Sequence, residues 1–161
     1  MSERERLLDM MRRLHAGDAW HGPSVKEALA GVDHHRAAAR PIAGGHTIWE
    51  IALHVAAWRN EVGARIGGKR PGMPEQGDWQ TVTDTSAEAW QRTLDALDAS
   101  HDALASVVRN LSDADLDRSL GTDVNPAGGS TIGLTLHGIV QHDAYHAGQI
   151  SLLKKLHDRP S

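Results

Sequence analysis

The chain has 161 residues, the size of one ordinary domain, and a formal net charge of −4 with histidine neutral. Its 17 basic and 21 acidic residues exclude a basic nucleic-acid platform and a simple electrostatic attraction to anionic membranes. The lack of cysteine excludes disulfides, thiolate nucleophiles and cysteine zinc sites, whereas eleven histidines could supply an imidazole-based metal site. We expect a single domain over residues 1–161 in a soluble cytoplasmic protein, with no signal peptide and no membrane span.

Helix starts are marked by capping boxes, in which a serine or threonine precedes a glutamate by three residues. The four boxes are Ser2 with Glu5, Ser24 with Glu27, Thr47 with Glu50 and Thr85 with Glu88. Ser130 or Thr131 is the expected cap of a final helix. Each box leads into a segment with helical periodicity, so we predict an all-α protein.

Apolar residues recur every three or four positions after these caps, which predicts four long amphipathic helices and a short one near residues 25–32. The stripes contain Leu7, Met11 and Leu14; Ile48, Ile51, Val55, Trp58 and Val62; Trp90, Leu94, Leu97, Leu104, Val108 and Leu111; and Ile132, Leu136, Ile139, Ile150 and Leu153. The connections at 67–84 and 111–129 are too long for tight hairpins. They indicate at least one crossover along a helical bundle.

His142 and His146 are four residues apart in the last predicted helix, so their side chains leave the same face about 5–6 Å apart. Gln149 follows on the same stripe. His54 lies on the flank of the apolar stripe of an earlier helix, and two such flanks can meet at the mouth of a bundle. Three imidazoles would hold one metal ion and leave a position open for water or substrate. The alternative is that these histidines only cap or hydrogen-bond, with His54 bonded to Trp58 or to a carbonyl.

Two segments together carry a resemblance to a known family. They are GHTIWEIALHVAAWR at residues 45–59, with an internal L-H-x-x-x-W, and QHDAYHAGQI at residues 141–150, with H-D-x-Y-H-x-G-Q. The chain resembles the DinB-like (YfiT-like) superfamily of metal-dependent enzymes from the first helix to Leu156. The resemblance implies a four-helix bundle in up-down-down-up order with a long crossover, and frequent homodimers. It also implies a divalent metal on His54, His142 and His146.

The chemistry expected at such a site is metal activation of a nucleophile, either water for hydrolysis or an external low-molecular-weight thiol for transfer. The expected partner is a small-molecule substrate. Zinc or nickel is the expected ion, with iron possible, because imidazole suits all of them. The alternative function is a non-enzymatic dimerisation or small-ligand-binding domain with a structural or vestigial metal. It is supported by the lack of an obvious general base, since Glu50 and Glu61 near His54 are more simply surface glutamates.

Two polar residues fall in the middle of apolar stripes, His101 and Asp143. A buried carboxylate needs a partner, so we expect Asp143 to be bonded to an imidazole, either His101 or a metal-ligand histidine. The alternative is that Asp143 turns outward to an arginine while His101 bonds a backbone carbonyl. Asp143, Gln149, Trp58 and His101 are therefore the residues expected around the three ligands.

Overall fold

The computed structural model describes residues 1–120 and 130–157, and helices dominate these ranges. The helices are α1 (Glu3–Ala16), α2 (Val25–Leu29), α3 (His34–Ala38), α4 (Ile48–Ile66), α5 (Ala87–Arg109) and α6 (Ile132–His157), with a 3-10 helix η1 (Asp113–Asp117). The described residues contain no strand, only an isolated antiparallel bridge between Ser119 and Thr131. The predicted all-α class is confirmed.

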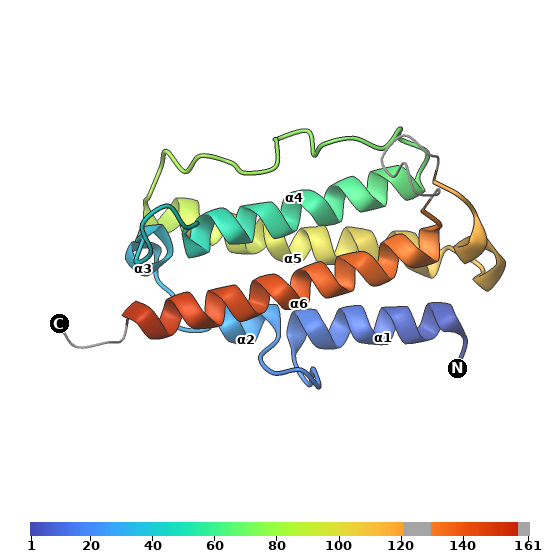
Figure 1. The fold of residues 1–161 in the computed structure, drawn as a ribbon, viewed down its shortest axis with the longest axis horizontal. Coiled ribbons are helices and arrows are strands. Elements are labelled where there is room, and N and C mark those ends of the chain that lie inside the picture. The colour runs from blue at the N-terminus through green and yellow to red at the C-terminus, as the bar shows by residue number, and fades with distance from the viewer. Residues whose placement is uncertain (121–129, 158–161) are drawn as a thin grey trace.

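The four long helices form a bundle in which α1 and α6 run one way and α4 and α5 the other (Figure 1). Because α4 and α5 are parallel, the chain must return along the bundle between them. The segment from residue 67 to 86 makes this crossover beside α4, as Figure 1 shows. The expected up-down-down-up order with a long crossover is therefore confirmed. Part of the second long connection, residues 121–129, lies outside the described residues.

Three of the predicted capping boxes, at Ser2, Ser24 and Thr47, are present with both of their hydrogen bonds. The box predicted at Thr85 is wrong by one residue, because Ser86 caps α5 and accepts a hydrogen bond from the backbone of Ala89. The carboxylate of Asp84 accepts from the backbone N–H of Ser86, the N-cap N–H that the glutamate of a capping box would otherwise bond.

The start of α6 is capped by Thr131, whose hydroxyl oxygen accepts from the backbone N–H of Leu134 at 3.1 Å. Two short helices had no counterpart in the sequence prediction, α3 behind an Asp33 cap and η1 behind a Ser112 capping box. Both are five residues long, which is too short for a 3.6-residue period to show.

The core consists of two apolar clusters, one near each end of the bundle. The first includes Trp49 of α4, Leu97 of α5 and Ile150 of α6. The second contains Val62 of α4, Leu104 of α5, Leu136 of α6, and Leu7 and Met11 of α1. Burying each large side chain contributes roughly 1.5–3 kcal/mol, so both ends of the bundle are held by packing. Along α6, the polar residues described next lie between the two clusters, and on α4 they start beside the first cluster.

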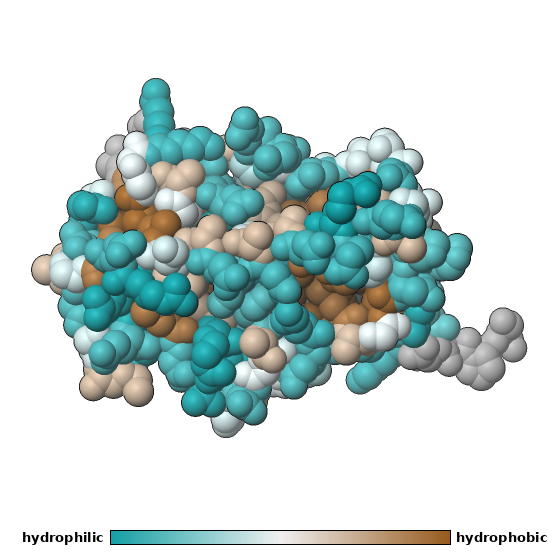
Figure 2. All heavy atoms as spheres, turned by 180° about the vertical axis from the view of Figure 1, so that it is seen from behind, coloured by the Kyte–Doolittle hydropathy of each residue, from teal (hydrophilic) through white to brown (hydrophobic). Residues whose placement is uncertain are grey.

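The surface opposite to the view of Figure 1 is mostly hydrophilic and carries separate apolar patches (Figure 2). Within the described ranges, none of the helices combines the length and apolar character that crossing a membrane requires.

Candidate metal centre

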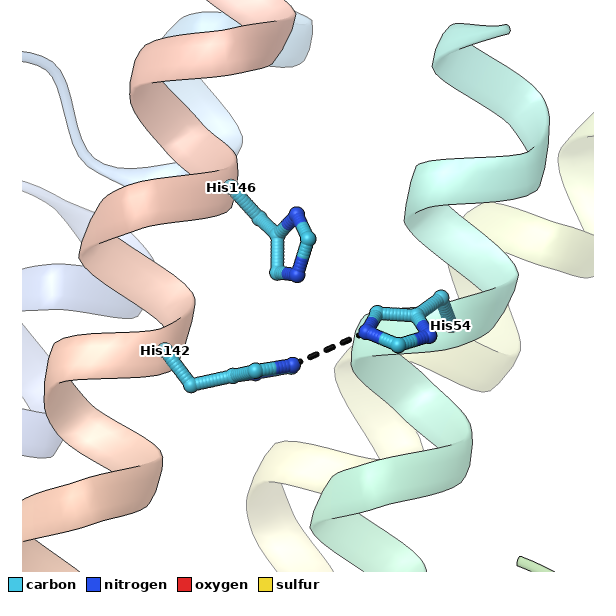
Figure 3. A group of neighbouring side chains, drawn as sticks. All are labelled: His54, His142 and His146. Atoms are coloured by element: carbon cyan, nitrogen blue, oxygen red, sulfur yellow. Dashed lines mark hydrogen bonds between the residues drawn. The ribbon is translucent and has the colours of Figure 1, made fainter. Parts of the chain in front are cut away.

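His54 of α4 and His142 and His146 of α6 point toward one another between the two helices (Figure 3). One nitrogen from each ring can be chosen so that all three lie within 4.8 Å of one another. The Nε2 atoms of His54 and His142 are 2.9 Å apart. His54 and His146 are buried, whereas the side chain of His142 is 26% exposed. The cluster is therefore open on the side of His142.

The outer nitrogen of each ring faces an oxygen acceptor. Nδ1 of His54 lies 2.8 Å from the backbone oxygen of Asp78, and Nδ1 of His146 lies 2.6 Å from Oε1 of Gln149. Nδ1 of His142 lies 3.4 Å from Oδ1 of Asp143. When an outer nitrogen donates to its oxygen, the Nε2 atom of the same ring keeps its lone pair for a cation. Without an ion, the 2.9 Å hydrogen bond between the Nε2 atoms of His54 and His142 needs a proton on one of the two. A carbonyl partner for His54 was the alternative to metal ligation, but here the carbonyl leaves Nε2 free to ligate.

The neutral state of the rings suits a cation. Burial, with a smaller contribution from the neighbouring His142, lowers the pKa of His146 to about 4. Burial also lowers the pKa of His54, although the hydrogen bond to the backbone of Asp78 has the opposite, smaller effect. Metal ligation requires neutral imidazole, so these two rings are in the ligating form at neutral pH. Two nitrogens on one tetrahedral zinc-like ion lie roughly 3.3 Å apart, which this cluster reaches by small ring movements. The residues therefore fit a divalent transition metal ion.

Asp143 is buried behind His142 and forms an ion pair with a buried arginine. Its Oδ2 accepts from Nε of Arg59 at 2.7 Å, and Arg59 also donates to the backbone oxygen of Leu97. Burial alone would raise the pKa of Asp143, but the charge of Arg59 and hydrogen bonds from His142 and Arg59 outweigh it and lower that pKa. The carboxylate therefore stays ionised and faces the outer nitrogen of His142.

The prediction for the partners of Asp143 is therefore only partly correct. A metal-site histidine faces it, as one version of the hypothesis required, whereas His101 stacks on the ring of His15 with centroids 4.2 Å apart. The alternative, in which Asp143 turns outward to an arginine, is correct only in the type of partner, because Asp143 and Arg59 both lie in the core. Arg59 was missed because a lone arginine beside an apolar stripe is normally exposed.

The crossover contributes two further residues to the site, Asp78 and Trp79. The Trp79 ring is stacked between His46 and His54, with centroids 3.4 and 3.9 Å away and both pairs tilted by 6°. The carboxylate of Asp78 accepts from Nε1 of Trp58 at 2.8 Å. Trp58, expected near the ligands, therefore holds the crossover in place while the backbone of Asp78 orients His54.

The two glutamates considered as general bases are both paired with cations. Glu50 bonds Arg40 at 2.6 Å. Glu61 bonds Arg65 at 2.9 Å and Lys69 at 2.6 Å, and its side chain is 1% exposed. The expectation of a surface position is therefore wrong for Glu61, because two cations compensate the cost of burying its charge.

Residues 19–150 match the DinB superfamily. The chain belongs to this superfamily. The matched range includes all three histidines of the cluster, His54, His142 and His146. No curated protein and no solved structure gives a significant match.

Proposed function

We propose that this protein binds one divalent transition metal ion through His54, His142 and His146 and is a metal-dependent enzyme acting on a small molecule. One observation carries the proposal: three imidazoles from two helices bring one ring nitrogen each within 4.8 Å of the others, while Nδ1 of each ring faces an oxygen. Hydrogen bonding of this kind is typical of metal-ligating histidines. Zinc or nickel is the proposed ion, with iron as the next choice.

When bound, such an ion supplies Lewis acidity, which activates water or a thiol as a nucleophile. Three protein ligands leave a coordination position for the reactant, and the exposed edge of His142 marks the side from which it approaches. Trp79 shields His54 from water on the crossover side. Both reaction types remain in the proposal, hydrolysis and thiol transfer, and the second needs an external thiol because the chain has no cysteine.

A second candidate function is a metal-binding domain without catalysis. The observation in its favour is that Glu50 and Glu61, the carboxylates nearest in sequence to His54, are both engaged in ion pairs. Neither is free to act as a general base, so the enzymatic reading relies on the ion itself to activate the nucleophile.

Metal titration tests the first part of the proposal. Protein stripped with a chelator should take up one equivalent of Zn²⁺ or Ni²⁺, measured by calorimetry and elemental analysis. His54→Ala and His142→Ala should lose this uptake. The matched control is His137→Ala, which removes a histidine of α6 that bonds Glu3 at 2.9 Å. Full uptake by the two cluster variants would contradict the site.

Catalysis is tested on the same proteins with small esters and amides, and with electrophiles plus a thiol. The metal-loaded protein should turn over one of these classes, and His54→Ala should not. Equal rates in the two proteins would contradict a catalytic role for the cluster and favour the second candidate.

A further inference from the structure

A cavity of about 360 Å³ lies between the second half of α4 and the first half of α6. Trp58 and Val62 line it from α4, Leu134 and Ile139 line it from α6, and His142 closes one end. Small-molecule sites in proteins are typically clefts of about 300–1,000 Å³ with mainly apolar walls. Its size and lining therefore suit part of a small organic ligand.

The cavity adjoins the histidine cluster at His142. That ring lines the cavity, is the most exposed of the three, and turns its Nε2 toward His54 (Figure 3). A neighbouring cavity of about 220 Å³ touches Gln149 and Leu152 but none of the three histidines. A ligand in the larger cavity therefore lies against the ring of His142, next to the cluster.

The polar groups of the cavity wall already have partners. Nε1 of Trp58 donates to Asp78 at 2.8 Å, and the hydroxyls of Ser130 and Thr135 bond each other at 2.7 Å. Arg65 donates to Glu61 at 2.9 Å and to the backbone oxygen of Gly72, and it shares the single charge of Glu61 with Lys69. A strongly polar uncharged group placed here would lose water without gaining a free hydrogen-bonding partner among these groups, whereas an apolar group would gain by leaving water.

The wall also has an open area at Gly138, one turn before His142. A Cβ atom at Gly138 would meet no heavy atom within 4 Å outside its own helix neighbourhood. Leu134, one turn earlier, is 66% exposed. A ligand lying along this part of α6 would cover that leucine and take the space beside the glycine.

We propose that this cavity binds a neutral apolar group of the substrate, such as an aryl or branched alkyl group, while the reacting group lies at the histidine cluster. The substrate class is thus a small molecule with a metal-directed polar end and an apolar end. The proposal rests on the metal site proposed above, and its test separates the two.

The probes are acetohydroxamate and benzohydroxamate, which bind a metal ion through the same group and differ in a methyl against a phenyl substituent. Both are titrated into the Co²⁺-loaded protein while the visible spectrum of the ion is recorded. Burial of the phenyl ring should make benzohydroxamate bind about 10–100-fold more tightly than acetohydroxamate. Equal affinities would overturn the proposal.

Two variants locate the effect. Gly138→Phe fills the cavity and should abolish the preference for benzohydroxamate. Gly148→Phe is the matched control, because it is also an exposed glycine of α6 with no heavy atom within 4 Å of its Cβ position, and it does not line the cavity. Gly138→Leu should reduce the preference for benzohydroxamate by a smaller factor. It keeps the test informative if Gly138→Phe does not fold.

Co²⁺ uptake distinguishes the two proposals. All the glycine variants should bind one equivalent of Co²⁺ with unchanged affinity. If the wild-type protein binds no Co²⁺, the metal site and the cavity inference both fall. If Co²⁺ binds but the phenyl group gives no advantage, or both phenylalanine variants lose it equally, the cavity inference alone is overturned.

Discussion

Arg59 and Asp143 form a buried ion pair that supports His142 of the histidine cluster. Arg59 is 1% exposed and Asp143 is 6% exposed, and each neutralises the charge of the other in the core. The pair holds a carboxylate oxygen against Nδ1 of His142. That contact favours the tautomer in which Nε2 can ligate.

Asp143→Asn keeps the shape of the side chain and removes its charge. We expect metal affinity to fall about 10–100-fold, because the orienting contact to His142 weakens. We also expect the free energy of unfolding to fall by about 3–5 kcal/mol, because Arg59 loses its buried counter-charge. Calorimetry and denaturant unfolding measure the two effects, with the exposed Asp102→Asn as control. If Asp143→Asn changes neither quantity, this role of the ion pair is wrong.

His15 predicts an acid-dependent loss of stability. Burial lowers its pKa to about 4, helped by the charge of Arg59 and opposed by Asp98. His15 therefore becomes protonated near pH 6.5 in the unfolded chain, but only near pH 4 in the folded protein. The free energy of unfolding is highest above pH 6.5 and decreases as the pH falls from 6.5 to 4. The contribution is about 2 kcal/mol between pH 7 and pH 4.5 after allowance for solvent screening.

The measurement is denaturant unfolding at several pH values with chelator present, for the wild-type protein and for His15→Gln. The variant has no proton to gain at this position, so its stability should depend less on pH. Parallel curves for the two proteins would assign the acid sensitivity to other groups.

At the scale of elements, the crossover between α4 and α5 is part of the site as well as a connection. Its Asp78 and Trp79 both contact His54, and the Trp79 ring also lies edge-on to His146 of α6, with centroids 6.0 Å apart. The histidine is thus held between a helix and a crossover segment, which restricts the ring without using a third long helix.

Trp79→Ala should lower metal affinity several-fold, because His54 gains rotamer freedom that binding must then remove. Helix content should change little, since Trp79 lies outside the helices and is 37% exposed. Trp20→Ala is the matched control, because Trp20 is fully exposed. Metal titration and circular dichroism of both variants check this, and equal affinities would show that the stack does not position His54.

The elements also show what sequence can predict here. Capping residues and apolar periodicity predict α1, α4, α5 and α6, with the cap of α5 displaced by one residue, because these signals are local. The length of the crossover predicted that it runs along the bundle, but not that Asp78 and Trp79 contact His54. In a segment without apolar periodicity, the sequence does not indicate which residues contact a neighbouring helix. Arg59 was missed for a related reason, since its partner Asp143 is 84 residues away and only the tertiary fold brings them together.

For the whole molecule, the proposed ion would link α4 to α6 at the level between the two apolar clusters. A ligand that binds only the folded state at 100 times its dissociation constant adds about 2.7 kcal/mol. For a chain of this size, that corresponds to roughly 5–10 °C in melting temperature. Chelation should lower the melting temperature of the wild-type protein by about this amount. His142→Ala should melt at the same temperature with and without chelator, and a metal-dependent shift in that variant would place the ion elsewhere.

A crystal structure of the zinc-loaded protein, with anomalous scattering recorded at the metal edge, tests the central claim most directly. The account predicts one strong peak at about 2.0–2.2 Å from nitrogens of His54, His142 and His146. A peak on other residues, or three rings that remain apart without an ion between them, would contradict it.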